Sequence, residues 1–169
     1  NLDLDLVVEG NGQGFARSLK VELGGELHEH PEFQTAHLTV PGLQVDVATA
    51  RREYYEYAAA LPVVEGATLR EDLYRRDFTI NAMAAELRQG GRLELIDFFG
   101  GEADLNKGLL RVLHNLSYVE DPTRILRGVR FEARYGFVME EETLGFCLQA
   151  IGDGMLDRVS QERLREELI

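Results

Sequence analysis

Leu2-Asp-Leu-Asp-Leu-Val-Val8 decides the fold, because its aliphatic residues and aspartates alternate with the period of a β-strand. Side chains two positions apart leave a strand on the same side, so Asp3 and Asp5 share one face. The other face carries aliphatic residues only, and we expect it to be core. Two exposed carboxylates this close repel each other unless a cation lies between them.

Magnesium suits such a pair, because it takes one or two carboxylates and fills its other positions with water and substrate phosphate. Asp-x-Asp is short, however, and taken alone it is explained more simply as a solvated strand face. Asp46 lies between Val45 and Val47 in another predicted strand and also points away from the core. It is either a lone surface aspartate or, if the two strands are neighbours, a third carboxylate in one patch. A paired metal site of that kind activates an attacking hydroxyl and stabilises a leaving pyrophosphate.

The composition narrows the class of protein. The chain has 169 residues, 44% of them apolar, and a formal net charge of −12, which argues against a general nucleic-acid binder. No run approaches the roughly 18 apolar residues of a membrane span, and the first residues do not show the pattern of a signal peptide. The single cysteine, Cys147, predicts a buried thiol in a reducing cytoplasm. Asn1 is not a start methionine and no stop signal follows Gln161, so we expect a fragment of a longer chain.

Beyond the first strand, the pattern predicts a mixed first half and a helical remainder. Helices are expected over residues 15–23, 69–74, 80–87, 122–135, 141–151 and from 161 onward, and strands over residues 26–30, 35–40, 43–49 and 93–96. Pro41-Gly42 predicts a hairpin turn. Residues 51–66 lack periodicity and predict a long loop. The order of these elements predicts an α+β head followed by an all-α neck.

The helix after Asp121-Pro122 carries an arginine face. Asp121 as N-cap and Pro122 at the first helical position are a typical helix start. Four arginines, Arg124, Arg127, Arg130 and Arg134, fall within an arc of about 120° at about 100° per residue. Opposite them, Ile125, Leu126, Val129 and Ala133 are expected to face the core. The arginines predict either an anion site, since guanidinium matches phosphate or a base edge, or surface pairs with Glu120, Glu132 and other acids.

A second polar cluster, Arg75-Arg76-Asp77 with Asn81, lies between two predicted apolar helices. Its carboxylate and amide could bond the hydroxyls of a ribose. It could equally be a buried structural salt bridge, and both interpretations stay open at this point.

Six stretches together resemble the class II tRNA nucleotidyltransferase and poly(A) polymerase family, of the polymerase-β-like superfamily. They are Leu2-Asp-Leu-Asp-Leu-Val-Val8, Val45-Asp-Val-Ala-Thr-Ala-Arg51, Arg75-Arg-Asp-Phe-Thr-Ile-Asn-Ala-Met-Ala84, Asp97-Phe-Phe-Gly-Gly101, Glu120-Asp-Pro-Thr-Arg-Ile-Leu-Arg127 and Arg158-Val-Ser-Gln-Glu-Arg163. The match covers nearly the whole chain, in the family's order and spacing. It implies a nucleotidyltransferase head with a small mixed sheet over residues 1–104, lacking its N-terminal segment. It also implies a helical neck over residues 105–169 that contains base recognition and the start of the body.

The resemblance also implies residue roles. Asp3 and Asp5 would bind the metal ions of a two-magnesium site, with Asp46 as a further catalytic carboxylate. Ribose recognition would fall to Arg76, Asp77 and Asn81. Asp121 and Arg124 would read the base, Arg127 and Arg130 would support the nucleotide, and residues 158–163 would stabilise the neck. The implied reaction is attack by an RNA 3′-hydroxyl on the α-phosphate of CTP or ATP, with release of pyrophosphate.

Two departures from the family pattern are visible. The family's Gly-Gly-x-x-Arg-Asp segment, which touches the triphosphate, is absent, and so are the C-terminal helices that hold the tRNA 3′ end. We therefore expect the fragment itself to be poorly active. The full-length segment 51–62 in place of the family's mobile loop counts against a purely CC-adding member. Addition of CCA, of A alone or of poly(A) stays open, as does a non-catalytic nucleotide-binding module with the same fold.

Overall fold

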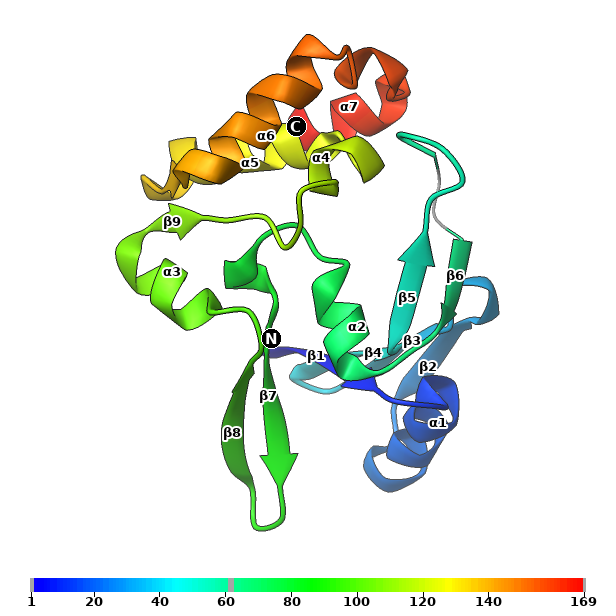
Figure 1. Cartoon of the computed structure of the whole chain (residues 1–169). Helices are drawn as coiled ribbons and strands as arrows, with labels where there is room; N and C mark the ends of the chain where they lie inside the picture. The colour runs from blue at the N-terminus through cyan, green and yellow to red at the C-terminus, as the bar shows by residue number, and fades with distance from the viewer. Residues whose placement is uncertain (1, 61–62, 169) are drawn as a thin grey trace. The chain divides into compact units, whose positions relative to one another are not determined.

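The computed structural model describes residues 2–60 and 63–168, and it confirms the α+β fold class (Figure 1). The chain divides into two compact units, each continuous in space but not in sequence. The first unit comprises Asn1–Glu53 and Val64–Asp72, and the second comprises Tyr54–Val63 and Leu73–Ile169. Within the described residues, no helix is both long enough and apolar enough to cross a membrane.

The first unit is built on a four-stranded sheet with the order β1-β4-β3-β2. Its strands are β1 (Leu2–Val8), β2 (Glu26–His30), β3 (Thr35–Val40) and β4 (Leu43–Thr49), with α1 (Gly12–Leu23) between β1 and β2 and the short 3₁₀ turn η1 (Pro31–Phe33) before β3. β1 pairs with β4 in parallel, whereas β3 pairs with β2 and β4 in antiparallel fashion. One face of the sheet packs on α1, through the buried residues Ala16, Ala36, Leu38, Val45 and Val47.

The predicted core face of β1 is only half correct. Leu6 and Val8 pack against the core cluster, but Leu2 is 74% exposed and Leu4 is 45% exposed. β1 lies at the edge of the sheet, so its first residues extend beyond the cover that α1 provides. Alternation therefore indicated the strand correctly and overstated how much of it is buried.

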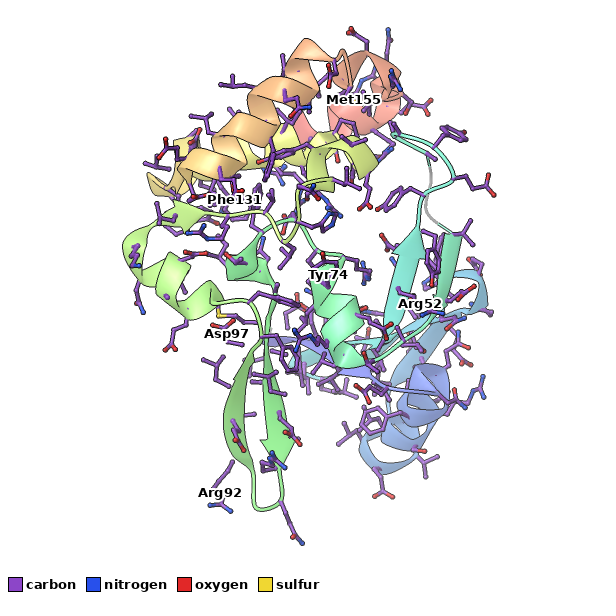
Figure 2. All side chains as sticks on the ribbon, viewed as in Figure 1. Arg52, Tyr74, Arg92, Asp97, Phe131 and Met155 are labelled. Atoms are coloured by element: carbon purple, nitrogen blue, oxygen red, sulfur yellow. The ribbon has the colours of Figure 1, made fainter. Side chains whose placement is uncertain are left out.

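Residues 51–66, predicted as a loop, contain two strands. β5 (Arg51–Tyr54) and β6 (Val63–Gly66) pair as a two-stranded sheet. Arg52 on β5 forms an ion pair with Glu65 on β6, 3.0 Å between Nη2 and Oε2 (Figure 2). Cross-strand charge pairs of this kind stabilise a ribbon that has little apolar periodicity. Positions 61 and 62 of the predicted mobile segment lie outside the described residues.

The second unit is mainly helical. Its helices are α3 (Gly101–Lys107), α4 (Ser117–Glu120), α5 (Thr123–Tyr135), α6 (Glu141–Gly152) and α7 (Gln161–Leu168), with 3₁₀ turns η2 (Thr79–Asn81) and η3 (Leu156–Arg158); α2 (Leu69–Tyr74) leads into it. Two-residue strands β9 (Leu109–Leu110) and β10 (Val138–Met139) pair in parallel. The core includes Phe78, Leu110, Tyr118, Ile125 and the predicted buried thiol, Cys147.

Residues 80–87 were predicted to be helical, and the structure corrects this. They form η2 and then β7 (Met83–Arg88), which pairs with β8 (Arg92–Asp97) in an antiparallel hairpin (Figure 1). The three-residue turn Gln89-Gly90-Gly91 has positive φ at both glycines, a conformation that glycine adopts without strain. The predicted strand over residues 93–96 is confirmed as part of β8.

Candidate functional site

The first group of candidate residues lies on the face of the sheet opposite α1. Asp5 on β1 is the direct partner of Asp46 on β4, and Asp3 is the partner of Gln44. Because paired residues of neighbouring strands point to the same side, all three predicted carboxylates share this face. Each of the three is exposed. The condition attached to Asp46, that its strand lies beside the first, is met.

Asp46 has a partner that the sequence argument missed. His37 lies opposite Asp46 in the β3–β4 pair, and its Nδ1 is 2.7 Å from Asp46 Oδ1. The turn at Pro41-Gly42 was the available signal. A two-residue turn there pairs Val40 with Leu43, and counting outward brings positions 37 and 46 together.

The donor set fits magnesium. Within residues 2–60 and 63–168, no group of three or more histidine, cysteine or acidic side chains is arranged to enclose a metal ion. Zinc and calcium sites generally need three or more protein ligands. Magnesium keeps several waters and needs only one or two carboxylates besides substrate phosphates. Two exposed aspartates on one strand face match that requirement.

The second group of candidates lies in the second unit, around the start of α5. Asp121 precedes the helix, which begins at Thr123, one residue later than predicted. Asp121 Oδ1 accepts hydrogen bonds from Thr123 N (3.1 Å) and Thr123 Oγ1 (2.6 Å), and so satisfies the helix start. The same oxygen accepts from Arg163 Nη2 of α7 at 2.8 Å. Oδ2 accepts no hydrogen bond from the part of the chain that the structure describes.

Arg124 is buried, which corrects the expectation of four arginines on one open face. It is 5% exposed. Nη1 donates to Ser117 Oγ (2.6 Å), and Nη2 donates to the carbonyl oxygen of Arg75 (2.6 Å). The predicted apolar face of α5 also needs correction. Ile125 is buried, but Val129 is 53% exposed, because the helix packs through Gly128 against Met139 and Phe78 instead.

The remaining arginines of α5 are partly exposed, and acids pair with two of them. Arg127 donates to Asp77 Oδ2 from Nε (2.9 Å) and Nη2 (2.6 Å), and Arg130 Nη1 is 3.1 Å from Glu167 Oε2. Both acids belong to the other acids that the sequence analysis considered besides Glu120 and Glu132. Arg134 lies over the Tyr135 ring, 5.3 Å from its centroid. A cavity of about 360 Å³ is lined by Arg127, Arg130, Phe131, Arg134 and Tyr135.

Charge and burial act in opposite directions on Arg127. Burial alone would lower the pKa of its guanidinium, but Asp77 and Glu167 outweigh this and raise it. The charge of Arg127 is therefore secure at any physiological pH.

The Asp77 cluster is a hydrogen-bonded unit. Asp77 is 6% exposed, and besides Arg127 it accepts from Asn81 Nδ2 (3.0 Å) and Phe78 N (2.8 Å). The structure thus contains a buried ion pair, as one of the two interpretations of this segment held, with Arg127 of α5 as the partner of Asp77. It also fixes Asn81, which is half-buried, in one orientation.

Asp97-Phe-Phe-Gly-Gly101 has a clear local role. Asp97 Oδ1 accepts from Gly101 N (2.9 Å) and Oδ2 accepts from Glu102 N (3.0 Å), at the start of α3 (Figure 2). Burial would raise the pKa of this carboxyl, but the backbone N–H groups outweigh it and lower the pKa. Gly100 has φ 78°, which a side chain would strain. This motif therefore holds the turn from β8 to α3.

Two further residues lie near Asp121 and Arg124: Arg163, which belongs to the stretch predicted to stabilise the neck, and His114, which sequence reasoning missed. Arg163 joins Asp121 to the carbonyl oxygen of Ala59 (3.3 Å). His114 is largely buried, and its ring lies 5.1 Å from that of Tyr74. Burial, with the nearby charge of Arg124, lowers the pKa of His114 to about 4. A single histidine in an irregular segment carries no sequence signal for such an environment.

The family model of the poly A polymerase head domain matches residues 1–111. An A-adding tRNA nucleotidyltransferase of Geobacter sulfurreducens is 48% identical over 100% of this chain, which spans 19% of that protein. A CC-adding tRNA nucleotidyltransferase of Deinococcus radiodurans is 44% identical over 79% of this chain and 36% of that protein.

Solved structures agree with these matches. A CCA-adding enzyme in an apo form has a TM-score of 0.94 and 52% identity, over 99% of this chain and 40% of that one. A tRNA nucleotidyltransferase complexed with a primer tRNA and an incoming ATP analogue has a TM-score of 0.85 and 44% identity, over 97% of this chain and 46% of that one. The chain therefore belongs to the poly A polymerase head domain family, among homologues that are A-adding and CCA-adding tRNA nucleotidyltransferases.

Proposed function

We propose that this chain is the nucleotide-transferring part of an RNA nucleotidyltransferase that adds A, or C and A, to the 3′ end of tRNA. The observation that carries the proposal is the alignment of Asp5 with Asp46, beside Asp3, on the open face of the sheet. In this proposal residues 1–104 form the head and residues 105–169 form the neck. ATP or CTP and a tRNA 3′ end are the partners.

Asp3 and Asp5 would hold Mg²⁺ in this site. When bound there, Mg²⁺ lowers the pKa of the attacking hydroxyl and neutralises charge on the leaving pyrophosphate. The chain itself supplies orientation. Asp3 and Asp5 lie on one strand, so they would fix the orientation of the triphosphate relative to the attacking hydroxyl. Asp46 adds an acceptor on the neighbouring strand.

The second unit would select the nucleotide. Asp121 keeps Oδ2 available as an acceptor, while its other oxygen is held by Thr123 and Arg163. Such a fixed acceptor beside a guanidinium discriminates bases, because the wrong base leaves buried polar groups unpaired. Arg124 is the donor of this pair. Asp77 and Asn81, with Arg76, would contact the ribose, and Arg127 and Arg130 would support the nucleotide.

The comparisons support addition of A or of CCA over addition of CC alone, since an A-adding relative is 48% identical and a CCA-adding enzyme of known structure is 52% identical. The A-adding relative is the more similar and matches the whole chain, whereas the match to the CC-adding relative covers 79% of it. The full-length segment 51–62 likewise counts against a purely CC-adding member.

The test uses the protein at its natural length with three tRNA transcripts, which end before the CCA, after the first C, or after CC. Each is incubated with Mg²⁺ and one triphosphate at a time, and products are resolved to single nucleotides. An A-adding enzyme extends only the transcript ending in CC, by one A. A CCA-adding enzyme extends the first two transcripts as far as CC with CTP and the third by one A with ATP, and a poly(A) polymerase produces a long run of A on any of them.

Asp3→Asn and Asp5→Asn test the metal site, since each keeps the shape of the aspartate side chain and removes the negative charge that binds the metal. We expect each to lower the rate of incorporation roughly 100-fold or more, without change in the circular dichroism spectrum. Incorporation at the wild-type rate by either variant would remove these residues from the metal site. Binding of ATP that is equally tight with and without Mg²⁺, and without turnover, would identify a non-catalytic module.

A further inference from the structure

Four polar side chains form a row across the sheet of the first unit. His28 on β2 pairs with His37 on β3, His37 pairs with Asp46 on β4, and Asp46 pairs with Asp5 on β1. Paired residues point to the same side, so the row lies on the face opposite α1. Asp46 therefore has a carboxylate on one side and an imidazole on the other.

The two neighbours of Asp46 act on it differently. Asp5 repels the Asp46 carboxylate, because like charges lie on adjacent strands only about 5 Å apart. His37 attracts it, with Nδ1 2.7 Å from Oδ1. A carboxylate only accepts hydrogen bonds, so the imidazole nitrogen is the donor. The hydrogen bond thus determines on which side of β4 the carboxylate rests.

Folding does not explain this contact. The side chain of His37 is 32% exposed and that of Asp46 is 51% exposed. Exposed pairs of this kind contribute little to stability, because water and salt screen them. The sheet already has its register from the buried face, where Ala36, Leu38, Val45 and Val47 pack.

We propose that His37 is a positioning residue for nucleotide transfer. It holds Oδ1 of Asp46 toward β3 and leaves Oδ2 as the oxygen that has no hydrogen-bond partner among the described residues. Asp46 then presents one fixed acceptor beside Asp3 and Asp5. The inference rests on the proposed function, since it assigns a task to the same carboxylates.

Three variants in the protein at its natural length separate this role from a structural one. His37→Leu removes the donor. His37→Asn keeps a donor, because the Asn side-chain amide occupies the place of Nδ1. His28→Leu is the matched control, being the same residue type on the same face of the adjacent strand, without a hydrogen bond to any described residue.

The measurement is single-turnover addition of A to a tRNA ending in CC, with kcat and KM for ATP determined in parallel. We expect His37→Leu to lower kcat about tenfold while KM stays near the wild-type value, as for other groups that orient a catalytic side chain. His37→Asn restores most of the rate, and His28→Leu leaves it unchanged.

A double-mutant cycle tests whether His37 acts through Asp46. In the Asp46→Asn background, His37→Leu should cause no further loss, because the carboxylate that it orients is gone. A further tenfold loss there would overturn the proposal. A decrease in His37→Leu no larger than in His28→Leu would overturn it as well, and so would a slow His37→Asn variant with a native circular dichroism spectrum. If the wild type incorporates no nucleotide under any condition, the proposed function fails first.

Discussion

At the scale of single residues, Arg124 shows how the structure changes a sequence interpretation. The helix pattern predicted an exposed guanidinium, but this one is buried and donates to Ser117 and to the backbone of residue 75. Any base that Arg124 reads must therefore be read by a side chain already fixed in place. Such a donor is rigid, and rigidity increases discrimination between bases.

Arg124→Lys should weaken that discrimination. Lysine keeps the positive charge but loses the planar fork that makes several directed hydrogen bonds. We expect the preference for the correct triphosphate, as a ratio of kcat/KM values, to fall about tenfold or more. Urea denaturation should show a loss of roughly 1–3 kcal/mol, because Ser117 and the Arg75 carbonyl lose a buried partner. An unchanged preference in a folded variant would take Arg124 out of base reading.

His114 gives the molecule a defined pH response. Its pKa is about 4 in the folded chain, lowered by burial and by Arg124, against 6.5 for an unperturbed histidine. Between these values the unfolded chain binds a proton that the folded chain does not, so stability increases as pH rises from 4 to 6.5. The shift corresponds to roughly 2–4 kcal/mol.

Urea unfolding of wild type and His114→Gln over pH 4 to 7 checks this response. Glutamine cannot titrate, so the variant should lose the pH dependence within that window and keep whatever the carboxylates contribute below it. Parallel pH curves for the two proteins would show that His114 is protonated in the folded state.

At the scale of elements, Gly101 makes a clear prediction about α3. A Cβ added there would meet the backbone carbonyl oxygen of Thr79 and lie 2.9 Å from Met83 Cγ. Gly101→Ala should therefore destabilise the protein by about 1–3 kcal/mol. Gly145 within α6 has open space around it, and Gly145→Ala should stabilise by about 0.5–1 kcal/mol. Thermal melting measures both, and equal shifts for the two variants would contradict the close approach at Gly101.

The sequence predicted some elements better than others, and the reason is physical. α1 and α5 carry strong 3.6-residue periodicity and were found close to their true limits. Residues 80–87 are a short apolar run, and such a run is as compatible with a helix as with a strand. Only the pairing of Ala84 with Ile96 and its neighbours decides for β7, and that pairing depends on a partner strand, not on local pattern.

For the candidate site, too, the sequence predicted the features that depend on local pattern and missed those that depend on tertiary contacts. Alternation placed Asp3, Asp5 and Asp46 on strand faces, and the parallel register then aligned two of them. The contacts of Asp121 with Arg163 and of Arg127 with Asp77 join positions far apart in sequence. Charge patterning cannot find such pairs, because it reports only neighbours on one helix face.

At the scale of the whole molecule, the net charge of −12 disfavours tight binding of this chain to RNA. Phosphate contacts supply most of the affinity of nucleic-acid binders, and an acidic chain repels phosphate. The chain spans less than half the length of the relatives it matches, so we propose that other parts of the full protein carry tRNA affinity.

The isolated 169-residue chain should therefore bind tRNA weakly, with a Kd of roughly 10⁻⁴ M or weaker at 150 mM salt. Fluorescence anisotropy with labelled tRNA measures this, and circular dichroism on the same sample verifies the fold. Micromolar binding by the folded chain would show that local arginines, such as those of α5, outweigh the overall charge.

The parallel pairing of β1 with β4 also has a consequence for how the protein folds. β2–β3 and β3–β4 are pairs of successive strands. β1, in contrast, is separated from its partner β4 by α1, β2 and β3, so it can pair only after these elements have formed. Closing that long segment carries the largest entropic cost in the sheet, so the pairing of Asp5 with Asp46 is expected to form last. Asp46 is thus kept apart from Asp3 and Asp5 on a growing chain and joins them only when the sheet is complete.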